Sequence, residues 1–168
     1  KLYGCNPKHR SLQSGRIQLE GGSLRVDNER LQFNVDAEDV AIRATVKKLN
    51  GQNLALCVRD SGLTDHYAVW FNGGNFFGVG RAVSDQWNDL QNWRKGSAFP
   101  GFFDLVLSVQ DDTLEASVNG EVILSVENDE LPGSGGLAIS TANGISLFSE
   151  IKMRYLGEAP SATDAPEH

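Results

Sequence analysis

Apolar and polar residues alternate along most of this chain, and this pattern constrains its fold more than any other feature. Between positions 40 and 47 every even-numbered residue is apolar, whereas the odd-numbered ones include Arg43, Thr45 and Lys47. The alternation recurs over 65–72, 102–110, 113–118, 121–127 and 145–155. Side chains two residues apart share one face of a β-strand, and one apolar face per strand is typical of antiparallel sheets with one solvated side. The pattern therefore predicts an antiparallel, all-β protein.

Turn residues separate the expected strands where hairpins need them. Asn119-Gly120 lies between two alternating segments and favours a tight type I′ turn, because both residues tolerate positive φ. Further short strands are expected at 16–19, 23–26, 30–34, 53–59, 75–83 and 136–141, about a dozen in all. So many short antiparallel strands hide their edges in two packed sheets or a barrel. We predict a two-sheet antiparallel β-sandwich of the jelly-roll type, with almost no helix.

The chain is long enough for one domain with its own core. Its 168 residues match a typical single domain, and we place the sandwich at 16–156, between an irregular N-terminal arm (1–15) and a flexible tail or linker (157–168). The tail is small, polar and Pro-containing, which is typical of linkers. A module of a longer chain, a processed protein and a plain terminus are the alternatives. Cys5 and Cys57 either form a disulfide that ties the arm to the sheet or remain thiols.

Charge and hydropathy argue against two kinds of partner. The formal net charge is −7, which argues against electrostatic binding of nucleic acid. No apolar run approaches the ~20 residues that span a bilayer, so we expect no membrane insertion by this segment. The negative charge slightly favours neutral or cationic ligands over phosphorylated ones.

Segment 84–99 interrupts the alternation and contains two of the three tryptophans, Trp87 and Trp93. We expect a long loop here, and long loops in compact domains tend to be functional. Flat indole faces stack on the C–H surfaces of sugars, while polar neighbours bond the hydroxyl groups, so the segment predicts a ligand-binding site. The expected ligand-binding residues are Trp87, Trp93, Arg94, Asp85, Arg81, Arg59 and His66.

Structural roles are the alternative for the same residues. Both indoles can cover the core as a lid, since Trp buries a large area. Arg59 can form an ion pair with Asp60 or Asp104, and His66 can be a structural residue rather than a base. No Gly-x-Ser-x-Gly motif or phosphate-binding glycine loop accompanies them, so we assign no catalytic residue.

Several motifs resemble those of known families. Three successive segments place an apolar strand ending in Arg before a Tyr and a second Arg: Leu56-Cys57-Val58-Arg59, His66-Tyr67-Ala68-Val69 and Gly78-Val79-Gly80-Arg81. The meander over 103–122 and the segment 132–139 continue the likeness. This succession resembles the concanavalin A-like jelly rolls, and within them laminin-G-like domains and the domain of unknown function 1080, whose members include 3-keto-disaccharide hydrolases. The likeness covers roughly residues 16–156.

The resemblance raises two questions of chemistry. Related endoglucanases carry Glu-x-Asp-x-x-Glu on one strand, but the nearest match here, Glu127–Glu130, is followed by Pro132 and is typical of a turn. We therefore do not expect that hydrolase chemistry. Many jelly rolls bind calcium, and acidic turns such as Asp111-Asp112 or the pair Asp60 and Asp65 offer oxygen ligands. Solvated turns are the simpler interpretation, so we expect no cofactor and keep Ca²⁺ as the alternative.

The expected function is a non-catalytic recognition module that binds carbohydrate or a protein partner. Similar modules are attached to bacterial receptor-type serine/threonine kinases and surface proteins, so the resemblance implies part of a larger bacterial or extracytoplasmic protein and an extracytoplasmic or secreted location. Two alternatives stay open: an enzyme resembling the 3-keto-disaccharide hydrolases, and a structural or oligomerisation domain.

Overall fold

The structure, a computed structural model, describes residues 16–61, 64–72, 75–84, 86–94, 99 and 101–157. These residues form eleven strands, every paired one antiparallel, and no helix. The strands are β1 (Ile17–Glu20), β2 (Ser23–Asp27), β3 (Arg30–Ala37), β4 (Val40–Asp60), β5 (His66–Phe71), β6 (Phe76–Val83), β7 (Gln86–Arg94), β8 (Phe103–Gln110), β9 (Thr113–Val118), β10 (Glu121–Glu127) and β11 (Gly135–Tyr155). The predicted antiparallel all-β class is confirmed.

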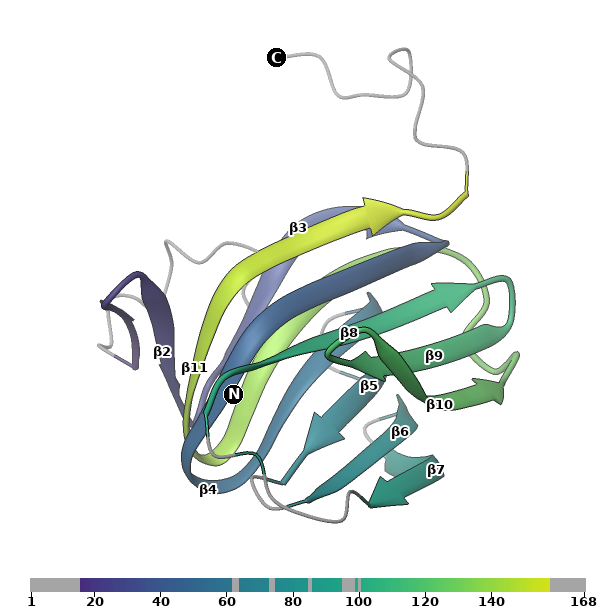
Figure 1. The fold of residues 1–168 in the computed structure, drawn as a ribbon. Coiled ribbons are helices and arrows are strands. Elements are labelled where there is room, and N and C mark those ends of the chain that lie inside the picture. The colour runs from purple at the N-terminus through teal and green to yellow at the C-terminus, as the bar shows by residue number, and fades with distance from the viewer. Residues whose placement is uncertain are drawn as a thin grey trace, which may run out of the picture.

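Two long strands, β4 and β11, connect the whole molecule. They pair with each other along most of their length, and Figure 1 shows both curving through the fold. Gly51 and Gly144 are paired partners midway along them. A Cβ at Gly51 would lie 2.3 Å from the Cα of Gly144, so the two backbones approach closely only because both residues lack a side chain. Sequence patterning predicts two strands in each of these segments; the structure joins them through this bend.

The bend divides one hydrogen-bonded network into two layers. We name the order β3-β11-β4-β5-β6-β7 the front sheet and the order β1-β2-β11-β4-β8-β9-β10 the back sheet. Alternate residues of both sheets point into one core. Phe71 of β5 and Phe103 of β8 meet edge to face there, with ring centroids 5.0 Å apart. The predicted two-sheet sandwich is therefore confirmed.

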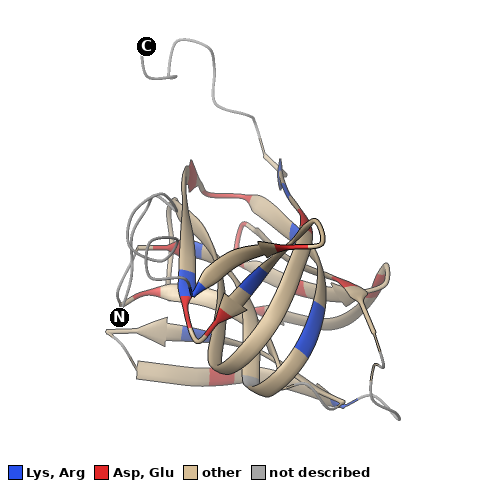
Figure 2. Cartoon of the chain, turned by 90° about the vertical axis from the view of Figure 1, so that its left-hand side faces the viewer, with Lys and Arg blue, Asp and Glu red and all other residues tan. Residues whose placement is uncertain are grey.

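The hairpin predicted at Asn119-Gly120 is confirmed. Both residues have positive φ, 51° and 84°, as a type I′ turn requires, and the flanking strands β9 and β10 pair as expected. Basic and acidic residues are interspersed along the strands, as the colouring of Figure 2 shows. In the part of the chain that is described, no helix has the length and apolar character needed to cross a bilayer. The arm expected at 1–15, with Cys5, and the tail from 158 onward lie outside the described residues.

The loop expected over 84–99 is wrong for most of its length, because residues 86–94 form β7 at the edge of the front sheet. The alternation breaks because the pairing register shifts at Leu90: Gly80 opposes Asp89, whereas Val79 opposes Gln91. Such a β-bulge reverses the face on which the following side chains lie. Trp87 consequently lies on the outer face of the sheet and Trp93 on the inner one.

Candidate functional site

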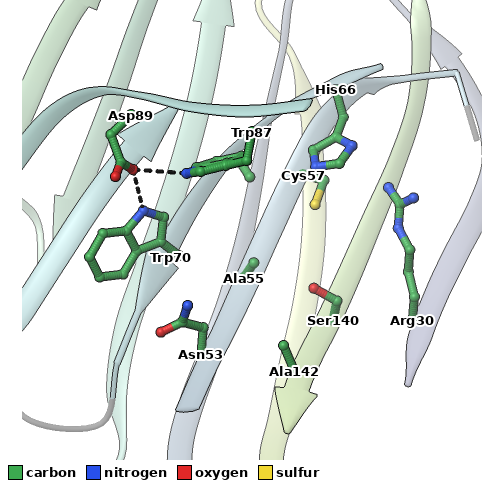
Figure 3. A pocket seen from close by; sticks show the side chains of 11 residues that line it. Arg30, Asn53, Ala55, Cys57, His66, Trp70, Trp87, Asp89, Ser140 and Ala142 are labelled. Atoms are coloured by element: carbon green, nitrogen blue, oxygen red, sulfur yellow. Dashed lines mark hydrogen bonds between the residues drawn. The ribbon is translucent and has the colours of Figure 1, made fainter. Parts of the chain in front are cut away.

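A groove of about 440 Å³ crosses the outer face of the front sheet (Figure 3). Five strands contribute to its lining: β3, β4, β5, β7 and β11. The lining residues are Arg30, Asn53, Ala55, Cys57, His66, Ala68, Trp70, Trp87, Asp89, Ser140 and Ala142. Three parts can be distinguished by their chemistry: an aromatic end, a floor of small residues and a polar end.

The aromatic end rests on two glycines of the neighbouring strand β6. The ring of Trp70 covers Gly78 so closely that a Cβ there would lie 2.3 Å from Cε2 of the indole. The ring of Trp87 covers Gly80, where a Cβ would lie 2.6 Å from Cζ2. The Gly-x-Gly spacing, which puts two missing side chains on the same face, therefore lets both indoles lie against the strand. Their other faces border the groove.

One carboxylate fixes both indoles. Nε1 of Trp70 and Nε1 of Trp87 donate to the same oxygen, Oδ1 of Asp89, at 2.9 and 3.0 Å (Figure 3). Hydrogen bonds to an ionised acceptor are stronger than those between neutral groups. Trp87 nevertheless stays 43% exposed, so the arrangement holds a large aromatic surface in place without covering it.

Small side chains keep the middle of the groove open. Cys57, Ala68 and Ala138 lie side by side on three adjacent strands and pack into a small cluster with Ala55. Since none of these side chains projects far from the sheet, the floor is shallow and mostly apolar. Ser140 follows on β11 and supplies a hydroxyl group at the edge of this floor.

Charged groups form the polar end. Arg30 of β3 donates through Nη2 to Oδ1 of Asp60, whose side chain is completely buried. Nδ1 of His66 lies 3.8 Å from the same oxygen. Arg30 and His66 line the groove, whereas the buried Asp60 does not, so this carboxylate holds the guanidinium of Arg30 at the edge of the groove. The positive charge of Arg30 is compensated by Asp60.

Cys57 is a buried thiol beside this polar end. The structure gives it as a free cysteine, and burial raises its pKa from 9.0 to about 11, against a smaller lowering by Arg30. A thiolate is the reactive form of cysteine, so the grouping of Cys57, His66 and Asp60 lacks an ionised nucleophile at neutral pH. The pairing with Cys5 involves a residue outside the described part.

Acidic groups in the groove do not form a catalytic pair. Retaining glycosidases place two carboxyl groups about 5 Å apart on either side of the scissile bond. Among the residues that the structure describes, Asp89 is the one carboxylate in the groove lining, and the side chain of Asp60 is fully buried. No cluster of three or more His, Cys, Asp or Glu able to hold a metal ion occurs within the residues that the structure describes.

The structure brings two of the expected site residues, Trp87 and His66, into the groove. Their rings lie 6.2 Å apart. Arg94 stacks on Phe76 at 5.0 Å from the ring centroid, and Phe76 in turn stacks on Trp70 at 5.4 Å. Arg94 therefore lies beyond the aromatic end, outside the groove lining.

Two other expected residues, Trp93 and Arg81, lie elsewhere, and a third is not described. Trp93 packs against Phe77 on the core side, with ring centroids 5.7 Å apart, in agreement with the lid interpretation for this indole. Arg81 forms an ion pair with Glu130 at 2.6 Å. Asp85 lies outside the described residues.

Arg59 also does not border the groove, because its side chain is buried at one end of the sandwich. It donates to the main-chain oxygens of Glu38, Leu131 and Asp111. An ion pair with Asp39, at 3.4 Å, completes the arrangement. The structural alternative for Arg59 therefore holds, with Asp39 as the partner instead of Asp60 or Asp104.

Sequence reasoning missed Trp70 and Arg30 as site residues. It counted Asp89 among the polar neighbours of the indoles without including it in the expected ligand-binding set. Alternation places Trp70 on the same face as His66, and the spacing of Gly78 and Gly80 was the available signal that this face receives large rings. Asp89 follows Trp87 by two residues, which is the spacing of one strand face. Arg30 meets Asp60 through tertiary pairing alone, since β11 lies between their strands.

The bent strands, the two facing sheets and the meander define the concanavalin A-like jelly-roll fold. No protein-family model matches the chain, and no curated protein matches it in sequence.

Solved structures match it by fold. A carbohydrate-binding module, CBM66 from Bacillus subtilis, aligns with 9% identity and a TM-score of 0.66 over 80% of this chain and 83% of that one. A β-glucanase from Bacillus licheniformis aligns with 9% identity and a TM-score of 0.69 over 86% and 84%. The exoplasmic/lumenal domain of VIP36, bound to Ca²⁺ and Man3GlcNAc, aligns with 13% identity and a TM-score of 0.65 over 88% and 84%. The chain therefore shares its fold with both carbohydrate-binding proteins and carbohydrate-cleaving enzymes.

Proposed function

We propose that this chain is a non-catalytic carbohydrate-binding domain whose site is the groove on the front sheet. The observation that carries the proposal is the pair of indoles, Trp70 and Trp87, held on Gly78 and Gly80 and fixed by Asp89. Because the rings are already in place before a ligand arrives, little side-chain entropy is lost on binding.

The chemistry of the groove suits a sugar ring. A pyranose has flat C–H surfaces ringed by hydroxyl groups, so it needs an aromatic face together with hydrogen-bonding groups in its plane. Here the indoles provide the faces, while Asp89, Asn53, Ser140 and Arg30 provide acceptors and donors along the same groove. A mostly apolar groove with a few placed polar groups is the usual form of a small-ligand site.

Binding is favoured over catalysis because, within the described part of the chain, Asp89 is the one carboxylate that lines the groove. A hydrolase of the glucanase type requires a second carboxyl group near the first. The carbohydrate-binding module and the lectin among the structural neighbours are in keeping with binding. We further propose that the domain acts outside the cytoplasm, where such a module meets polysaccharides.

A glycan array followed by titration calorimetry tests the proposal. We expect the protein to bind at least one class of oligosaccharide, and Trp87→Ala and Trp70→Ala each to weaken this binding by about 10- to 100-fold, as for central aromatic anchors of a binding site. Phe102→Ala is the matched control, because Phe102 is an aromatic residue of similar exposure, 47%, outside the groove.

Retained folding is checked by circular dichroism for each variant. Absence of binding to any glycan, or equal losses in Phe102→Ala and Trp87→Ala, would overturn the proposal.

A further inference from the structure

The charges around the groove are unequally compensated. Within the described part of the chain, Arg30 and Asp89 are the charged side chains in its lining besides the titratable His66. Arg30 is paired with the buried Asp60. Asp89, in contrast, forms no ion pair with any described residue: its hydrogen-bond partners are the neutral N–H groups of Trp70 and Trp87. The aromatic end therefore carries one uncompensated negative charge.

This charge lies where two aromatic faces are also available. The faces of indole rings attract cations through the ring quadrupole, and Trp is the most effective side chain in this respect. Oδ1 of Asp89 accepts both indole hydrogen bonds, so Oδ2 can accept from a ligand. An ammonium group placed against Trp70 or Trp87 gains an ion pair and a cation–π contact at one point.

We propose that the groove prefers glycans that carry a free, protonated amine. The inference rests on the proposed carbohydrate-binding function and names the substrate class of the same site. The aromatic end takes the sugar that bears the ammonium group, and the small-residue floor with Arg30 and His66 takes the neighbouring ring through its hydroxyl groups.

The other charge classes fit the groove less well. A uronic acid at the aromatic end would place its carboxylate beside that of Asp89, and two neighbouring negative charges repel each other. A neutral sugar satisfies the hydrogen-bonding capacity of Asp89 but leaves its charge uncompensated. Arg94 stacks on Phe76 and lies outside the groove lining. Its guanidinium therefore does not fill the place beside Asp89 that the ammonium group of a ligand would take.

Three β-1,4-linked tetrasaccharides that differ in one substituent test the preference: glucosamine with a free amine, N-acetylglucosamine and glucose. Calorimetry at low ionic strength, at a pH where the amine is protonated, should show that the amine-bearing chain binds about tenfold more tightly than the other two. Added salt should reduce this difference.

Asp89→Asn separates charge from shape. The amide oxygen of Asn can still accept from both indoles, whereas the negative charge is removed. Any loss of affinity common to the three chains cancels when their affinities are compared, so the ratio between the amine-bearing chain and the other two should fall to about one. Glu121→Gln is the matched control: it removes one exposed negative charge on β10, in the back sheet and outside the groove lining, and should leave the preference intact. The comparison of the two variants separates recognition of the ammonium group by Asp89 from general attraction of a cationic glycan to a protein of net charge −7.

Each result decides the inference. Equal or weaker binding of the amine-bearing chain, a preference that survives in Asp89→Asn, or binding confined to glycans without an amine would overturn it and leave the carbohydrate-binding function standing. Absence of binding to every glycan would overturn both.

Discussion

The ring of Trp70 lies directly on Gly78, at a distance that no other residue at position 78 permits. The nearest indole atoms would lie 2.3, 2.4 and 2.5 Å from a Cβ on this glycine. All three atoms belong to the Trp70 side chain. Glycine at position 78 therefore makes room for the indole ring and is not required by a turn of β6. This contact makes the aromatic end of the groove sensitive to a single methyl group.

Gly78→Ala should therefore displace Trp70 and break its hydrogen bond to Asp89. Overpacking of this kind costs about 1–3 kcal/mol of stability, which a domain of this size tolerates. Glycan binding should fall about as far as in Trp70→Ala. Unchanged glycan affinity, measured by calorimetry on a folded variant, would contradict the proposal that Trp70 forms part of the binding surface.

Gly80→Ala should act differently, because the added Cβ would lie 2.4 Å from the main-chain oxygen of Asn88. A backbone atom cannot rotate away, so we expect the pairing of β6 with β7 to loosen and the melting temperature to fall further than in Gly78→Ala. Thermal unfolding of the two variants provides the comparison. A smaller destabilisation at Gly80 than at Gly78 would contradict this packing.

Arg59→Met should be among the most destabilising single substitutions in the chain. Its buried guanidinium bonds three main-chain oxygens and Asp39, and removing it leaves these acceptors without a donor. The expected loss of unfolding free energy is about 3–5 kcal/mol, measured by urea denaturation. The glycan affinity of the remaining folded protein should stay unchanged, since Arg59 does not line the groove. A loss of affinity without a loss of folded protein would instead indicate that Arg59 contributes to the binding site.

Cys57 should make stability depend on alkaline pH. Burial raises the pKa of its thiol in the folded state to about 11 from 9.0, so the folded state retains a proton that the unfolded state loses. The stabilisation is complete below pH 9 and is lost as the pH rises through about 11, a change of about 2–3 kcal/mol. Cys57→Ala should flatten this part of the curve.

Tyr67 also has a raised pKa, mainly through burial, so the Cys57 contribution is read as the difference between the wild type and Cys57→Ala, both in a Cys5→Ala background. Identical pH profiles for the two would contradict a buried neutral thiol. Slow reaction of the native thiol with a disulfide reagent, and rapid reaction after unfolding, is the accompanying expectation.

Alternation was sufficient to predict most of the sandwich because each strand has one buried face. The alternation over 65–72 sets His66 and Trp70 on one face of the strand, opposite Tyr67. The Asn119-Gly120 hairpin follows from its turn residues. The rule fails at Leu90, where one extra residue reverses the facing of β7. A period of two does not allow for such a bulge, so the pattern predicts a loop where the structure has a strand.

The polar end of the site could not be derived from local pattern. Arg30 and Asp60 lie thirty residues apart and meet because β11 brings β3 and β4 into one sheet. Strand order is a tertiary property, and it equally explains why Arg59, one residue from Asp60, faces Asp39 at the end of the sandwich.

Indole N–H resonances provide the most direct test of the groove as a glycan site. The chain contains three tryptophans, whose signals are assigned with single Trp→Phe variants in ¹⁵N-labelled protein. On titration with a glycan identified by array, the signals of Trp70 and Trp87 should shift together and saturate with the calorimetric affinity, while that of Trp93, which packs against Phe77 on the core side, should stay in place. A bound glycan that moves the Trp93 signal and leaves Trp70 and Trp87 unchanged would contradict the account.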